Sequence, residues 1–175
     1  MFKTKFIELK TKRYLRKNAT KRLTTDYGEA NNIGIIFSSE DLLKHKAVKS
    51  FVKKLTLEGK NVTVISFVGK GKQNHEFLYD IITPGDISFW GSINDETAQK
   101  FVNESFDYLF NLDLDSNQVI ENILAKSKAK CRVGIYNEEK SSFYELMINP
   151  GKEGSISNLI EDIHHYARKL TVNEN

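Results

Sequence analysis

The chain has 175 residues, of which 39% are hydrophobic and 28% are charged, and its net charge is +3 at pH 7. These proportions are typical of a folded domain and exclude an intrinsically disordered chain. No run approaches the roughly 20 apolar residues that a bilayer-spanning helix needs, and the first residues lack the apolar core of a secretory signal. The single cysteine, Cys131, excludes an internal disulfide. We therefore expect a cytoplasmic protein.

Positive charge is concentrated at the N-terminus. Residues 1–22 contain nine lysines and arginines against one acid, Glu8, so this segment carries +8 and the rest of the chain −5. Residues 2–22 contain no Gly or Pro and are predicted to form a helix. Phe2, Phe6 and Leu9 share one face of its first turns. We expect the helix to dock through that face and to project into solvent beyond it.

A strand–helix–strand unit follows. Residues 33–37 (IGIIF) and 62–68 (VTVISFV) are short apolar runs rich in β-branched residues, which is typical of strands buried on both faces. Gly59 stands where a helix would end in the left-handed conformation. Between the two runs, apolar residues recur at the helical period of 3.6, and they are Leu43, Ala47, Val48, Phe51, Val52 and Leu55.

The same alternation continues to the C-terminus. Residues 69–86 are predicted to be a polar loop, and residues 87–90 a short strand. Further strands are expected at 106–114, 131–136 and 143–148, and helices at 95–106, after Asp115, and at 156–170. Strands that alternate with helices favour a parallel sheet covered on both faces. We predict an α/β fold with three Rossmann-like layers and a mostly parallel sheet of about five or six strands. The basic helical extension covers residues 1–23, and a single α/β domain covers residues 33–171.

Four stretches carry a family resemblance. They are DISFWGSIND (86–95), FVNESFDYLFNLDL (101–114), ILAKSKAKCRVGIYN (123–137) and YELMI (144–148). With the basic helix before them, they resemble an uncharacterised family of Bacteroidota proteins, the domain of unknown function 6913, over almost the full length. This resemblance implies no activity and supplies no catalytic residues.

A second likeness concerns the fold. Residues 106–136 are similar to a strand–helix–strand in the N-terminal half of heptosyltransferase-like glycosyltransferases, which implies a Rossmann-like topology. Those enzymes bind the nucleotide sugar in a second Rossmann half. We expect no such half here, so their activity does not transfer to this chain.

Five residues are candidates for a ligand site at the carboxyl ends of the strands: Ser38, Gly69, Lys70, Asp113 and Asp115. Gly69 and Lys70 open the sequence GKGK after a strand, where phosphate loops occur, but neither the Walker nor the dinucleotide pattern is present. We favour a solvated turn. Asp113 and Asp115 could hold Mg²⁺ or act as acid and base. A turn with a helix cap is the favoured interpretation, since Asp115 and Gln118 have the spacing of a capping box.

Three other motifs are assigned structural roles. His164 and His165 are adjacent, so their side chains diverge by about 100° on a helix instead of converging on a metal, and no metal site is predicted. Cys131 opens an apolar strand and is expected to be buried and unreactive. Phe89 and Trp90 could form a ligand platform or an interface anchor, but core packing at a strand end is favoured.

The basic helix is the strongest functional signal. Its candidate binding residues are Lys10, Lys12, Arg13, Arg16, Lys17, Lys21 and Arg22, and the candidate partners are nucleic acid, the ribosome or another anionic macromolecule. A membrane surface is less favoured, because few apolar residues line the helix. The alternative is a solvated helix, or one packed on an acidic patch of the protein or of a second copy in a homo-oligomer.

Two functional hypotheses remain. We favour a non-enzymatic binding module over a small enzyme that handles nucleotides or nucleotide sugars at the strand ends, because no catalytic set is evident. No cofactor is predicted.

Overall fold

The computed structural model describes residues 2–72, 78–149, 151 and 154–171, with the side chains of residues 2 and 3 outside the description. Its centre is one parallel sheet in which the strands lie in the order β3-β2-β1-β4-β5-β6. The predicted fold class is confirmed. The strands are β1 (Asn32–Ser38), β2 (Asn61–Phe67), β3 (Asp80–Ile82), β4 (Tyr108–Asn111), β5 (Cys131–Ile135) and β6 (Leu146–Ile148).

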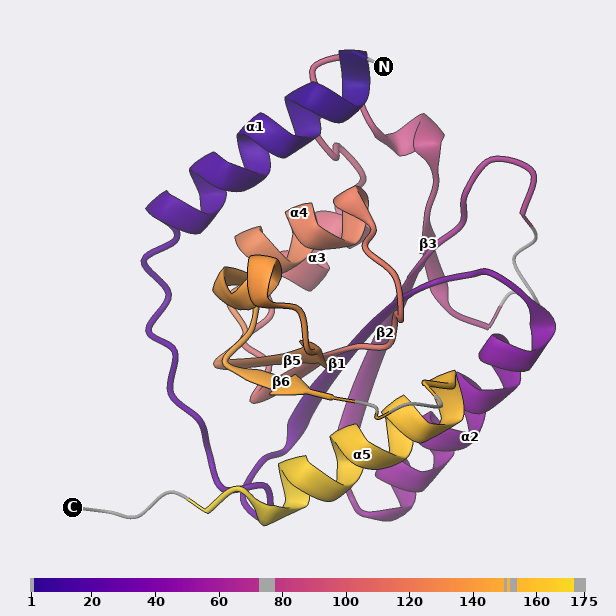
Figure 1. Cartoon of the computed structure of the whole chain (residues 1–175), viewed down its shortest axis with the longest axis vertical. Helices are drawn as coiled ribbons and strands as arrows, with labels where there is room; N and C mark the ends of the chain where they lie inside the picture. The colour runs from indigo at the N-terminus through magenta and orange to yellow at the C-terminus, as the bar shows by residue number, and fades with distance from the viewer. Residues whose placement is uncertain (1, 73–77, 150, 152–153, 172–175) are drawn as a thin grey trace.

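Helices cover both faces of the sheet (Figure 1). Helices α2 (Leu42–Leu57) and α5 (Ile156–Lys169) pack on one face, and α3 (Glu96–Asn103) and α4 (Gln118–Lys126) on the other. The side chains of β1 alternate between the two cores, with Ile33, Ile35 and Phe37 facing α2 and α5 and Ile36 facing α3 and α4. A strand buried on both faces therefore needs the continuous apolar run that the sequence shows.

The third strand is not where we predicted it. Residues 87–90 form no strand of the sheet, since Ile87 makes only an isolated antiparallel bridge with Ile93. A tight turn closes this segment, in which the Ser88 N–H donates to the Ser92 carbonyl at 2.8 Å and Gly91 has a φ of +70°. The strand β3 lies earlier, inside the predicted loop, and pairs with β2.

Smaller differences concern element ends. The strand predicted at 143–148 begins only at Leu146, because a 3-10 helix, η3 (Glu138–Phe143), precedes it. A second 3-10 helix, η2 (Pro84–Asp86), follows β3. In α2, Leu43 is exposed and Lys44 is buried, so the predicted apolar stripe is wrong at its first residue. Gly59 does end the helix with a φ of +81°.

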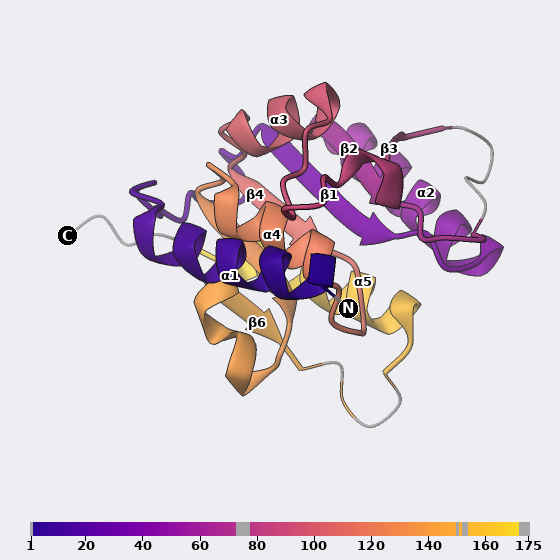
Figure 2. The ribbon, with the colours of Figure 1, turned by 90° about the horizontal axis from the view of Figure 1, so that it is seen from above.

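Helix α1 (Phe2–Lys17) does not project into solvent. It lies along the shorter helix α4 (Figure 2), and its residues Ile7 and Thr11 are buried. Leu9, expected to dock, is 63% exposed. Tyr14 and Leu15 also pack on the core from this face, which the polar Thr11 interrupts. The Thr11 hydroxyl donates to the Ile7 carbonyl at 2.8 Å and accepts from Asn122 Nδ2 at 2.9 Å, so a polar residue occupies the centre of the contact.

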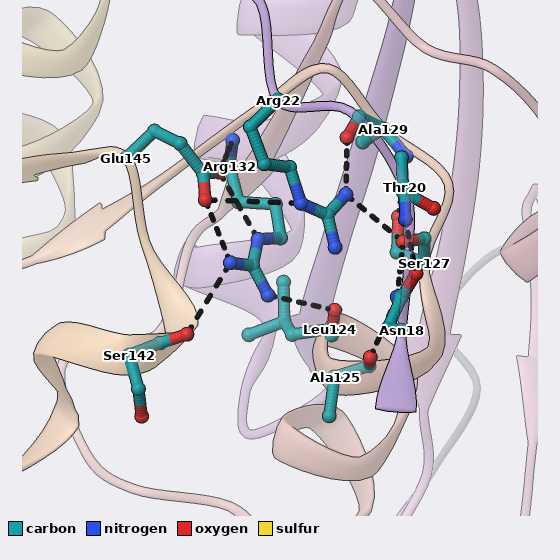
Figure 3. A network of polar contacts seen from close by, with 10 residues as sticks. All are labelled: Asn18, Thr20, Arg22, Leu124, Ala125, Ser127, Ala129, Arg132, Ser142 and Glu145. Atoms are coloured by element: carbon teal, nitrogen blue, oxygen red, sulfur yellow. Dashed lines mark hydrogen bonds and ion pairs between the residues drawn. The ribbon is translucent and has the colours of Figure 1, made fainter. Parts of the chain in front are cut away.

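The chain after α1 is held by the C-terminal end of α4 (Figure 3). The helix ends at Lys17, not at Arg22, and the next residues form neither helix nor strand. Asn18 Nδ2 donates to the carbonyls of Ala125 and Ser127 at 2.9 and 3.0 Å. The Arg22 guanidinium donates to the carbonyls of Ser127 and Ala129. The last carbonyls of a helix lack intrahelical partners. Asn18 satisfies one of them, and Arg22 binds the carbonyls that follow the helix, so these contacts fix the N-terminal segment at the end of α4.

The other end of α1 rests on the turn at Gly91. A Cβ atom added to this glycine would lie 2.7 Å from the Ile7 backbone nitrogen and 2.9 Å from the Phe6 carbonyl carbon. The backbone of α1 therefore approaches the turn as closely as only glycine permits. Both ends of the helix are fixed to the domain.

We predict that Gly91→Ala destabilises the protein by about 2–4 kcal/mol, because it combines left-handed backbone strain with a collision against α1. Gly59→Ala is the matched control, since its φ is also positive but nothing lies within 4 Å of the added Cβ. That change should cost only about 1 kcal/mol. Urea unfolding of both variants measures the difference, and equal losses would show that the turn does not seat α1.

Candidate functional site

The carboxyl ends of β1 and β4 are joined by a buried carboxylate. Asp113, which is 1% exposed, accepts hydrogen bonds from the Ser38 backbone N–H and from the Ser38 hydroxyl, each at 2.7 Å. Lys44 Nζ, from the first turns of α2, lies 2.6 Å from the same carboxylate and 2.8 Å from Glu40. Asn117 Nδ2 donates to the Ser38 hydroxyl at 2.9 Å.

This arrangement sits where Rossmann-like folds bind anions. The strand order reverses between β1 and β4, and the ligand phosphate in such folds meets the loop after the first strand. Here the donors suited to a phosphate, a backbone N–H, a hydroxyl and an ammonium group, all point at Asp113. The carboxylate of Asp113 thus occupies an anion-binding position from within the protein.

The five predicted ligand-edge residues therefore separate. Ser38 and Asp113 meet as described. Gly69 begins a solvated turn in which the Lys72 N–H donates to its carbonyl at 3.0 Å, and Lys70 is exposed. Asp115 is exposed, and it does not cap α4. The cap is Asn117, whose side chain accepts from the N–H groups of Val119 and Ile120. The structure also brings in Lys44, which sequence reasoning missed.

The basic residues of the N-terminal segment fall into two groups. Lys10 and Arg22 face inward, where Lys10 Nζ donates to the Ser92 hydroxyl and Arg22 binds carbonyls. Lys12 is exposed and pairs with Glu8 at 2.7 Å. The other four predicted binding residues are also exposed, and they are Arg13, Arg16, Lys17 and Lys21. Lys5, which is not among the predicted residues, is exposed as well.

An aromatic cluster adjoins α1 at its N-terminal end. Phe89 and Trp90 are 57% and 62% exposed, so the expected core packing is wrong. The turn at Gly91 carries both rings to the side of Phe6, whose ring centroid lies 6.3 Å from that of Phe89 and 5.3 Å from that of Trp90. Exposed aromatic rings thus lie at one end of an exposed row of cations.

A family model of unknown function, DUF6913, matches residues 3–170. The chain belongs to that family. No curated protein and no solved structure matches it. For this DUF6913 protein, function must therefore be argued from the geometry of its own residues.

Cys131 and His164 are buried in the DUF6913 domain, away from the strand-end residues described above. Burial raises the pKa of Cys131 to about 11, which keeps the thiol protonated and unreactive at neutral pH. His164 Nε2 lies 3.0 Å from a Glu58 oxygen, and His165 is exposed on the same helix. Among the described residues, no helix combines the length and apolarity needed to cross a bilayer.

We predict that Asp113→Ala destabilises the DUF6913 domain by about 3–5 kcal/mol, because the buried Lys44 ammonium loses its buried counter-ion. Formate, which carries the missing carboxylate, should restore part of the loss, and thermal unfolding with and without formate measures both effects.

The control is Glu40→Ala, which removes the half-exposed partner of the same lysine and should cost less than about 1 kcal/mol. If formate stabilised the wild-type protein as much as it stabilised the Asp113→Ala variant, the claim that Asp113 fills an anion-binding position would be wrong.

Proposed function

We propose that this protein binds single-stranded nucleic acid through the outer face of α1 and the aromatic cluster of Phe6, Phe89 and Trp90. The observation that carries this proposal is the separation of apolar and basic side chains on α1. The apolar side packs against α4, while Lys5, Lys12, Arg13 and Arg16 are exposed.

The exposed cations form a compact row. At 100° per residue, these four side chains leave the helix within an arc of about 100°, opposite Ile7 and Thr11. At a rise of 1.5 Å per residue, Lys5 and Arg16 are separated by about 16 Å along the axis. A row of this length suits several consecutive phosphates of one strand. Because both ends of α1 are fixed, the cations are presented without ordering a free helix on binding.

The aromatic cluster supplies what a purely cationic surface lacks. Proteins that bind single strands combine a positive track for the backbone with aromatic rings on which bases stack. Phe89 and Trp90 stand at the end of the cationic row with more than half of their surface exposed. Stacking accepts every base, so the proposal implies affinity with little sequence preference.

A membrane surface is less well supported. An interfacial helix buries an apolar face in the lipid, but the apolar face of α1 lies against α4. Among the side chains that the structure describes, Leu9 is the large apolar residue on the exposed side of α1. We also expect a cytoplasmic location and an origin in Bacteroidota. Self-association through α1 is the alternative to nucleic-acid binding.

A nucleotide- or nucleotide-sugar-handling role, suggested by the likeness to heptosyltransferase-like enzymes, lacks support at the strand ends. The donors that would hold a phosphate after β1 are engaged with Asp113. Gly69 and Lys70 lie in a turn that contributes no contact to that carboxylate among the described residues.

We predict that a short oligouridylate quenches the fluorescence of Trp90, which is the single tryptophan of the chain. Affinity should fall steeply with salt, and the triple change Lys12→Gln, Arg13→Gln and Arg16→Gln should flatten the log–log slope by about two, at roughly 0.7 per lost phosphate contact. Titrations at several salt concentrations give the slopes.

The control removes the same charge from α2 through Lys46→Gln, Lys53→Gln and Lys54→Gln, all at exposed positions, and should leave the slope unchanged. Equal weakening by both triples would indicate bulk charge instead of an α1 site. A fluorescence change with anionic vesicles and none with oligouridylate would replace nucleic acid by membrane as the partner, and light scattering of the free protein reports self-association.

A further inference from the structure

A cavity of about 350 Å³ lies at the carboxyl ends of β4 and β5, and no described residue of α1 lines it. One wall comes from the first turns of α4 and the other from η3. The floor contains Asn111, the last residue of β4, and Ile135, the last residue of β5. Ligands of open α/β sheets bind outside the carboxyl ends of the strands, which is where this cavity opens.

The side-chain amide of Asn111 is incompletely satisfied. The residue is 5% exposed, and its Nδ2 donates to the Tyr144 hydroxyl at 2.8 Å. Its Oδ1 is buried and has no hydrogen-bond partner among the described residues. A buried carbonyl without a donor is unfavourable, so a donor that reaches this atom gains more than it would at an exposed position.

Tyr144 defines a second polar point beside Asn111. Burial raises the pKa of Tyr144 to about 12, so the phenol stays neutral at physiological pH. Its oxygen accepts from Asn111 and its own proton can be donated. The two side chains together offer an acceptor and a donor, which is the pattern that an amide group matches.

The charged residues of the lining carry a net negative charge. Glu121 pairs with Lys140 at 2.9 Å across the cavity wall, and Asp115 adds a further negative charge at the rim. The acids therefore outnumber the base among the charged residues that line the cavity. Ile120, Ile135 and Phe143 contribute apolar surface.

We propose that this cavity binds a small molecule in which an amide or amine N–H group is attached to an apolar body. The N–H group donates to Asn111 Oδ1, and the apolar body rests on the aliphatic and aromatic wall. The net negative charge of the lining favours such a group over phosphates and carboxylates. The described residues that line this cavity are not those proposed to bind nucleic acid on α1, so different variants test the two proposals and either can fail alone.

Three probes that share one ring test the class of ligand: benzamide, benzylamine and benzoate. Nitrogen–proton correlation spectra of the full chain should show that benzamide and benzylamine at millimolar concentration shift the Asn111 side-chain amide, and that benzoate does not. No shift with either of the first two probes, or equal shifts with all three, would overturn the proposal.

Two variants localise the effect. Asn111→Leu should weaken benzamide binding about tenfold or more, the size expected for one buried hydrogen bond. Tyr144→Phe keeps the aromatic ring and should weaken benzamide binding less than Asn111→Leu does. Asn122→Leu makes the same change at a buried asparagine that contacts Thr11 of α1, and it should leave benzamide affinity intact. If Asn111→Leu fails to fold, the Tyr144→Phe titration decides, and unaltered affinity in either variant would contradict the site.

Discussion

The arrangement of this protein depends on the hydrogen-bonding demand of carbonyl groups in the last turn of α4 and in the residues just after it. Ser127 and Ala129 receive donors from Arg22, Ala125 from Asn18, and Leu124 from Arg132, whose guanidinium also pairs with Glu145 at 2.7 Å. The bonds from Asn18 and Arg22 form because the segment after α1 crosses the end of α4. They hold the C-terminal end of α1 beside α4 and place the Arg22 guanidinium inside the protein.

The strand ends show how a fold can keep its topology while altering the use of a site. The sheet has the strand order of dinucleotide-binding proteins, yet the anion position after β1 is filled by Asp113. A carboxylate held by a backbone N–H, a hydroxyl and an ammonium group stabilises the contact between β1, β4 and α2. Fold alone therefore says little about activity here, and the chemistry of each site has to be argued from its own residues.

The sequence predicts the sheet well because buried parallel strands leave a strong signal, such as the continuous run in β1. The short strand β3 leaves a weak one, since its three residues pair with β2 alone and only Ile82 is buried. The docked face of α1 carries the apolar residues Ile7, Tyr14 and Leu15 at helical spacing, but the polar Thr11 interrupts the row. Thr11 is satisfied by Asn122, a partner more than a hundred residues away. Pairings of this kind, including Lys44 with Asp113, depend on tertiary structure and have no local pattern.

The contact between α1 and α4 joins parts of the chain that are synthesised at different times. Helix α1 ends at Lys17, but its binding surface begins at Gln118, so about a hundred further residues must be synthesised first. At roughly 5–20 residues per second, the cationic helix leaves the ribosome on the order of 5–20 s before the α4 surface on which it packs has been synthesised. During that interval its apolar and basic sides are both uncovered, beside a ribosome rich in RNA. Folding of the domain then withdraws the apolar side and leaves the basic side in solution.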